Sequence, residues 1–149
     1  MNPLWTVALV GAFLAGSLVA LQAPTNAMLS RAVASPVNAA LVSFGVGFAA
    51  LIVVALAIGV RPNTDAVRGL PWYAWTGGLY GAVFVAIAAF AAPRLGITFF
   101  LMVGIAGQLA MALLLDKVGA FGLAAQEITL QRVAGVTLVI AGAWLVQQR

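Results

Sequence analysis

Cysteine and histidine are both absent from this chain of 149 residues. Without thiols the protein can form no disulfide, and without imidazole it lacks the commonest general acid–base group of enzymes. The same two absences remove the usual ligands of zinc and haem. We therefore expect no metal site and no cofactor, and a catalytic triad built on histidine is excluded.

Charged side chains are also scarce. They make up 7% of the residues, against roughly 25% in soluble domains, and hydrophobic residues make up 64%. The sequence therefore predicts an integral membrane protein, with the lipid bilayer as its surroundings. The formal net charge is +4, but the basic residues are spread along the chain and form no basic patch, so we expect no nucleic-acid partner.

The acidic residues are Asp65, Asp116 and Glu127. Each falls in an expected loop or at an expected helix end, and no two have a spacing typical of paired acid–base groups. The sequence also has no glycine-rich phosphate-binding loop. We therefore predict that the protein is not an enzyme, and we expect no ionisable group in the middle of the membrane.

Apolar runs alternate with short polar segments along the whole chain. A helix needs about 20 apolar residues to span a bilayer. The expected spanning helices cover residues 3–29, 36–60, 71–92, 95–115 and 128–147. We expect an all-α integral membrane protein with five transmembrane helices in a single transmembrane domain, 1–149. The first run lacks a basic start, so we interpret it as an uncleaved helix.

Small residues recur at four-residue spacing on several of these runs, a pattern that allows helices to approach closely. Gly77 and Gly81 form a G-x-x-x-G motif in the third run. The glycines that we predict to pack against other helices are Gly16, Gly77, Gly81 and Gly104. The pattern leaves open whether the face with Gly77 and Gly81 also lines a cavity.

Neutral polar groups interrupt the apolar runs. Gln22, Pro24 and Asn26 lie at the far end of the first run, and Gln108 lies near the middle of the fourth. Each such group costs several kcal/mol if lipid surrounds it unpaired, so these groups must face protein, water or a ligand. We predict substrate contacts at Gln22, Asn26, Tyr80 and Gln108, suited to a neutral, zwitterionic or weakly polar solute. The alternative is that the amides only bridge helices.

The basic residues are almost evenly divided between the two sides of the membrane. With five spans, one side holds Arg61, Arg68, Lys117 and Arg132, and the other holds Arg31, Arg94 and Arg149. Because orientation follows the Lys/Arg excess of short loops, this balance favours dual topology and an antiparallel, ten-helix homodimer. The alternatives are one orientation set by weak cues, or an oppositely oriented partner protein such as a closely related paralogue.

An ordered set of short motifs resembles one family. The motifs are Leu21-Gln22, Asn26-Ala27, Ser43-Phe44, Pro71-Trp72, Trp75-x-Gly77-Gly78, Gly107-Gln108-Leu109 and Leu115-Asp116-x-x-Gly119-x-x-Gly122. They run in the order found in the YdcZ-like family of bacterial inner-membrane proteins, a branch of the drug/metabolite transporter superfamily. The resemblance implies a five-helix unit in the bacterial inner membrane, which pairs in antiparallel fashion and transports an unknown small molecule.

A more distant resemblance links the chain to the small multidrug resistance exporters, which have four helices. This chain differs from them because its first helix has no acidic residue. We therefore expect a transporter that works by alternating access at the interface of an antiparallel homodimer, with a site of neutral polar groups on the first, third and fourth helices. Three alternatives stay open: a membrane scaffold or assembly subunit, a channel, and a proton-coupled exporter of the multidrug type.

Overall fold

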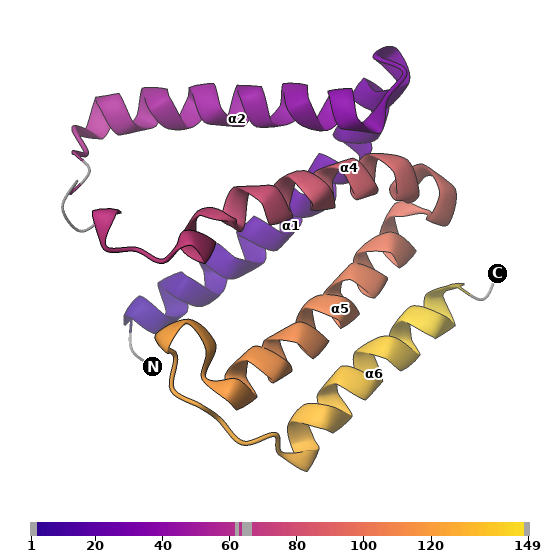
Figure 1. Cartoon of the computed structure of the whole chain (residues 1–149). Helices are drawn as coiled ribbons and strands as arrows, with labels where there is room; N and C mark the ends of the chain where they lie inside the picture. The colour runs from indigo at the N-terminus through magenta and orange to yellow at the C-terminus, as the bar shows by residue number, and fades with distance from the viewer. Residues whose placement is uncertain (1–2, 62, 64–66, 148–149) are drawn as a thin grey trace. The chain divides into compact units, whose positions relative to one another are not determined.

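The computed structural model describes residues 3–61, 63 and 67–147, and in this part of the chain the elements are helical (Figure 1). The five long helices are α1 (Pro3–Ala32), α2 (Pro36–Ile58), α4 (Gly77–Leu95), α5 (Ile97–Val118) and α6 (Leu130–Gln147), with short 3₁₀ helices η1 (Trp72–Trp75) and η2 (Ala120–Gly122). All five are long and apolar enough to cross a membrane. The prediction of an all-helical chain with five such helices is therefore confirmed.

The helices fall into two compact units, Met1–Arg94 and Leu95–Arg149. In the first unit, α1 continues through the polar segment around Pro24 and ends at Ala32. Pro24 has no N–H, so the helix lacks one backbone hydrogen bond there. The hydroxyl of the next residue, Thr25, donates to the carbonyls of Leu21 at 3.1 Å and Gln22 at 2.9 Å. Neither acceptor is the carbonyl of Ala20, which the missing N–H of Pro24 would otherwise have bonded.

A tight corner joins α1 to α2. Ala34 takes a left-handed conformation, with φ of 53°. Ser35 is the N-cap of α2 and accepts a hydrogen bond from the backbone N–H of Asn38 at 3.2 Å, while Pro36 occupies the first turn. At its other end α2 stops at Gly59, whose φ of 68° is the left-handed conformation that glycine adopts without strain. The two caps fix the length of α2.

The third apolar run differs from the expected range of 71–92 at its start. Pro71 precedes the 3₁₀ helix η1, and α4 begins only at Gly77. Thr76 holds this break, because its hydroxyl donates to the carbonyl of Tyr73 at 2.7 Å and its N–H donates to the same carbonyl at 3.1 Å. The local bonds close a tight turn in place of the first turns of an α-helix.

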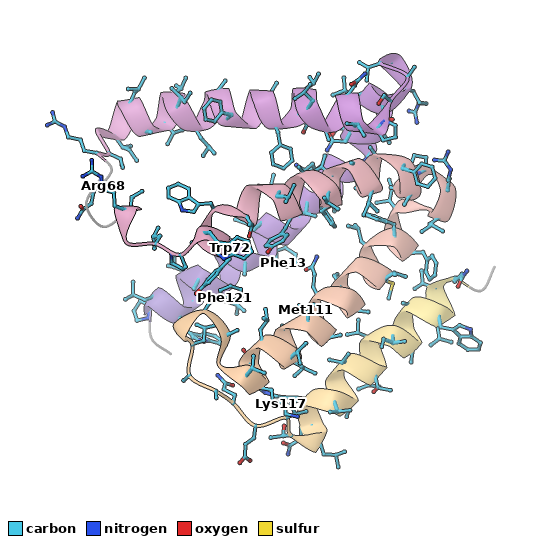
Figure 2. The ribbon with its side chains drawn as sticks, viewed as in Figure 1. Phe13, Arg68, Trp72, Met111, Lys117 and Phe121 are labelled. Carbon is cyan, nitrogen blue, oxygen red and sulfur yellow. The ribbon has the colours of Figure 1, made fainter. Side chains whose placement is uncertain are left out.

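Small side chains dominate the buried positions of the first unit. They are Ala23, Asn26 and Ala27 of α1, Ala39 and Ala40 of α2, and Val85, Ala88, Ala89 and Ala92 of α4. Large apolar side chains such as Phe13 and Leu56, each 76% exposed, lie on the outside, and Figure 2 shows Phe13 projecting from its helix. This distribution is typical of membrane helices, which pack through small residues and turn large ones toward lipid.

The second unit is a pair of neighbouring helices, α5 and α6, which lie side by side. Their contact includes Gly142, where an added Cβ would lie 3.6 Å from the Cε of Met102. Gly119 ends α5 with φ of 60°, and the chain then turns back so that the N–H of Gln126 donates to the carbonyl of Asp116 at 2.8 Å. The helix expected over residues 128–147 therefore begins at Leu130.

Candidate functional site

The most unusual buried group is the side chain of Asn26 on α1. It is 4% exposed, and it is the one polar residue among the buried side chains of the described chain. Its amide nitrogen, Nδ2, has no hydrogen-bond partner within the described residues. An unmade hydrogen bond of this kind costs about 1–3 kcal/mol. Asn26 therefore carries a buried donor whose hydrogen bond is not made by the described residues.

Gln22 lies one helical turn before Asn26. Its half-buried side chain lines a cavity of about 280 Å³ between α1 and α2, together with Ser43, Phe44 and Gly47. The polar groups of this cavity are an amide and a hydroxyl, and its other walls are apolar. Sequence reasoning singled out Gln22 but not Ser43, although Ser43 is one of few polar residues in α2 and lies four residues before Gly47.

Tyr80, the third candidate contact of the first unit, lies on α4 with an exposed side chain. Its hydroxyl is hydrogen-bonded to the Thr76 hydroxyl at 2.9 Å. The next residue, Gly81, lies against α2, because an added Cβ would come 3.1 Å from the ring of Phe44. Gly77 has no atom within 4 Å of such a Cβ. The G-x-x-x-G motif thus makes a close helix contact at its second glycine.

Gln108 belongs to the second unit, where it lies on α5 with an exposed side chain. It is not among the residues of the cavity between α5 and α6. Gly104 on the same helix and Gly16 on α1 have no atom within 4 Å of an added Cβ. Within its own unit, each of these two positions therefore has room for an added side-chain atom.

A charged cluster closes one end of the second unit. Arg132 forms a salt bridge with Asp116 at 3.1 Å and also donates to the side-chain oxygen of Gln126. The two charged side chains are 36% and 34% exposed, and both line a cavity of about 370 Å³ whose remaining walls are apolar residues of α5 and α6. The sequence placed both residues at helix ends but gave no sign of their pairing, which depends on how the loop after α5 turns back.

Comparison with protein-family models matches residues 7–145 to the family described as "Putative inner membrane exporter, YdcZ". The chain belongs to the YdcZ family. The resemblance seen in the short motifs is thereby confirmed over almost the full length of the chain. Membership places the chain among multi-pass inner-membrane proteins of an exporter family, and such a family is not one of enzymes. Comparisons with curated proteins and with solved structures find no match.

Proposed function

We propose that this YdcZ-family chain exports a small molecule by alternating access, and that its substrate site includes the amides of Gln22 and Asn26. The observation that carries the proposal is the buried Nδ2 of Asn26, which has no acceptor among the described residues. Buried polar groups normally have hydrogen-bond partners, and exceptions call for a functional explanation. A substrate oxygen that reaches Nδ2 during transport would supply the missing partner.

The position of these amides supports the same proposal. Gln22 and Asn26 flank Pro24, where α1 lacks one backbone hydrogen bond. Although α1 continues through Pro24, a proline inside a helix frees one backbone carbonyl and eases bending there. Both amides are uncharged and carry donors and an acceptor. The substrate class that fits is a neutral, zwitterionic or weakly polar solute.

The working unit that we propose is an antiparallel homodimer of ten helices. The near balance of basic residues between the two sides favours insertion in both orientations. The open faces of Gly16, Gly77 and Gly104 would allow helices of a second copy to come close. In such a dimer the two copies form an inverted pair, which is the arrangement that alternating access uses in many transporters. Tyr80 and Gln108 would add polar contacts to the shared site.

Single cysteines test this proposal directly, because the native chain has no thiol. We would introduce Gln22→Cys, Asn26→Cys and Gln108→Cys and label the reconstituted protein with a membrane-impermeant maleimide. The matched control is Ala39→Cys, at a fully buried alanine of α2. We expect labelling at positions 22, 26 and 108 and none at 39. If none of the three sites reacts, the chain has no water-accessible cavity there, and a scaffold function replaces transport.

A further inference from the structure

A cavity of about 610 Å³ lies at the corner where α1 meets α2 and where α4 ends, wholly within the first unit. Its volume falls in the range of roughly 300–1,000 Å³ that is common for small-molecule sites. Two arginines, Arg31 and Arg94, and two serines, Ser30 and Ser35, contribute its polar walls. None of the lining residues is acidic. The cavity is separate from the one that Gln22 lines, because the two share no residue.

The positive charge of this cavity has no counter-charge among the described residues. Neither Arg31 nor Arg94 takes part in a described salt bridge; the one that occurs joins Arg132 and Asp116. Asp116, which lies in the last turn of α5, and Glu127, which follows α5, belong to the second unit, and neither lines the cavity. Asp65 lies outside the described residues.

Helix α2 adds to the positive potential of the same corner. Its N-terminus begins beside the cavity, at Ser35 and Pro36, and its first turn has no acidic residue. The first backbone N–H groups of a helix carry a partial positive charge that favours anions. Two arginines and the residues at the N-terminus of α2 therefore line a cavity with no negative side chain in its wall.

The guanidinium of Arg94 is held in place by its own helix. Its carbon Cζ lies 3.8 Å from the centre of the Phe90 ring, and one of its terminal nitrogens donates to the backbone carbonyl of Phe90. Stacking of this kind fixes the plane of the group. Arginine carries five N–H donors, and among the described residues Arg94 makes no other hydrogen bond, so most of its donors are available to an anion.

We propose that Arg31, Arg94 and the N-terminus of α2 bind a phosphate group, carried by an anionic phospholipid headgroup or present as a free ion. Paired arginines match phosphate oxygens in geometry and charge. The apolar part of the wall, including Phe90 and Pro93, continues the surface of membrane-spanning helices. Basic pockets between the ends of such helices are suited to phospholipid headgroups. The site does not depend on the transport function proposed above.

The test is a titration of the purified, delipidated full-length chain with phosphatidylglycerol in a non-ionic detergent, followed by thermal unfolding. Phosphatidylcholine is the lipid control, and inorganic phosphate is added as a competitor in a parallel series. The variants are R31Q/R94Q and the matched control R61Q/R68Q, which removes two exposed arginines from the segment between α2 and η1. R31K/R94K keeps both positive charges, so the division of basic residues between the two sides of the membrane is unchanged. It loses the planar guanidinium groups.

We expect phosphatidylglycerol, and not phosphatidylcholine, to stabilise the wild type and R61Q/R68Q. We expect R31Q/R94Q to need at least about tenfold more lipid for half of the effect, since two charge-assisted contacts are lost. The lipid concentration that gives half of the effect in R31K/R94K should lie between the values of the wild type and R31Q/R94Q. If R31Q/R94Q does not fold, the comparison of R31K/R94K with the wild type tests the proposal. Competition by inorganic phosphate would identify the free ion as a ligand, and no competition would identify the headgroup. The proposal would be overturned if R61Q/R68Q lost as much affinity for phosphatidylglycerol as R31Q/R94Q. It would also be overturned if both R31Q/R94Q and R31K/R94K bound the lipid as the wild type does.

Discussion

Replacement of Asn26 by alanine separates a structural amide from a substrate-binding one. In the described structure the Nδ2 donor is buried and unpaired, and such a donor costs about 1–3 kcal/mol. Asn26→Ala removes this cost. We therefore expect the free energy of unfolding to stay the same or to rise by about 1 kcal/mol.

The effect on transport should have the opposite sign. A hydrogen bond between neutral groups contributes about 0.5–1.5 kcal/mol, and tenfold in affinity corresponds to about 1.4 kcal/mol. Asn26→Ala should therefore weaken the apparent affinity for substrate by roughly two- to tenfold. The control is Asn38→Ala, the same change at an exposed amide on α2, which should leave transport unchanged.

Two assays on the same preparations check this prediction: reversible denaturation of the reconstituted protein, and transport of a substrate found by ligand-dependent thermal stabilisation, which reports binding to the folded state. The reasoning is refuted if Asn26→Ala lowers the free energy of unfolding by about 2 kcal/mol or more. That result would mean that Nδ2 has a structural partner, and the amide would then hold helices together. Unchanged transport would refute it as well.

Three further changes follow from the geometry. Asp116→Ala and Arg132→Ala should show a coupling of about 1 kcal/mol in a double-mutant cycle of unfolding free energies. The coupling should be small because the two side chains form a salt bridge at 3.1 Å but are about one-third exposed. Strictly additive effects of the two changes on the free energy of unfolding would contradict the pairing. Gly81→Leu should destabilise by about 1–3 kcal/mol, because a ring of α2 lies 3.1 Å from the position of an added Cβ, whereas Gly78→Leu, where no atom lies within 4 Å of an added Cβ, should have little effect when both are followed by thermal unfolding. Gln108→Leu should impair transport without loss of the dimer on size-exclusion chromatography, and unimpaired transport would make Gln108 structural.

Long hydrophobic runs made the helices predictable from sequence. A run of about 20 apolar residues has few alternatives in a membrane, and all five helices are present in the structure. The segment 71–76 was less predictable, because hydrogen bonds of the Thr76 hydroxyl and N–H decide between a 3₁₀ turn and an α-helix. These local bonds leave no trace in the hydrophobic pattern.

The candidate site was predictable in part. A proline between two amides in an apolar run drew attention to Gln22 and Asn26, because unpaired polar groups are costly in lipid. The pairing of Asp116 with Arg132 was not foreseen, since it requires the loop after α5 to turn back through glycines with positive φ. The basic cavity was not predicted for a similar reason. Arg31 and Arg94 are distant in sequence, and they line one cavity because the chain turns at the corner between α1 and α2.

The measurement that tests the account most directly is the orientation of the chain in the membrane. Ala32→Cys and Leu70→Cys place single exposed thiols beyond opposite ends of α2, and an impermeant maleimide on intact cells reads which of them faces outward. An antiparallel homodimer predicts that about half of the copies react at each position, with the rest reacting after permeabilisation. Complete reaction at one position and none at the other would show a single orientation and would contradict the antiparallel homodimer.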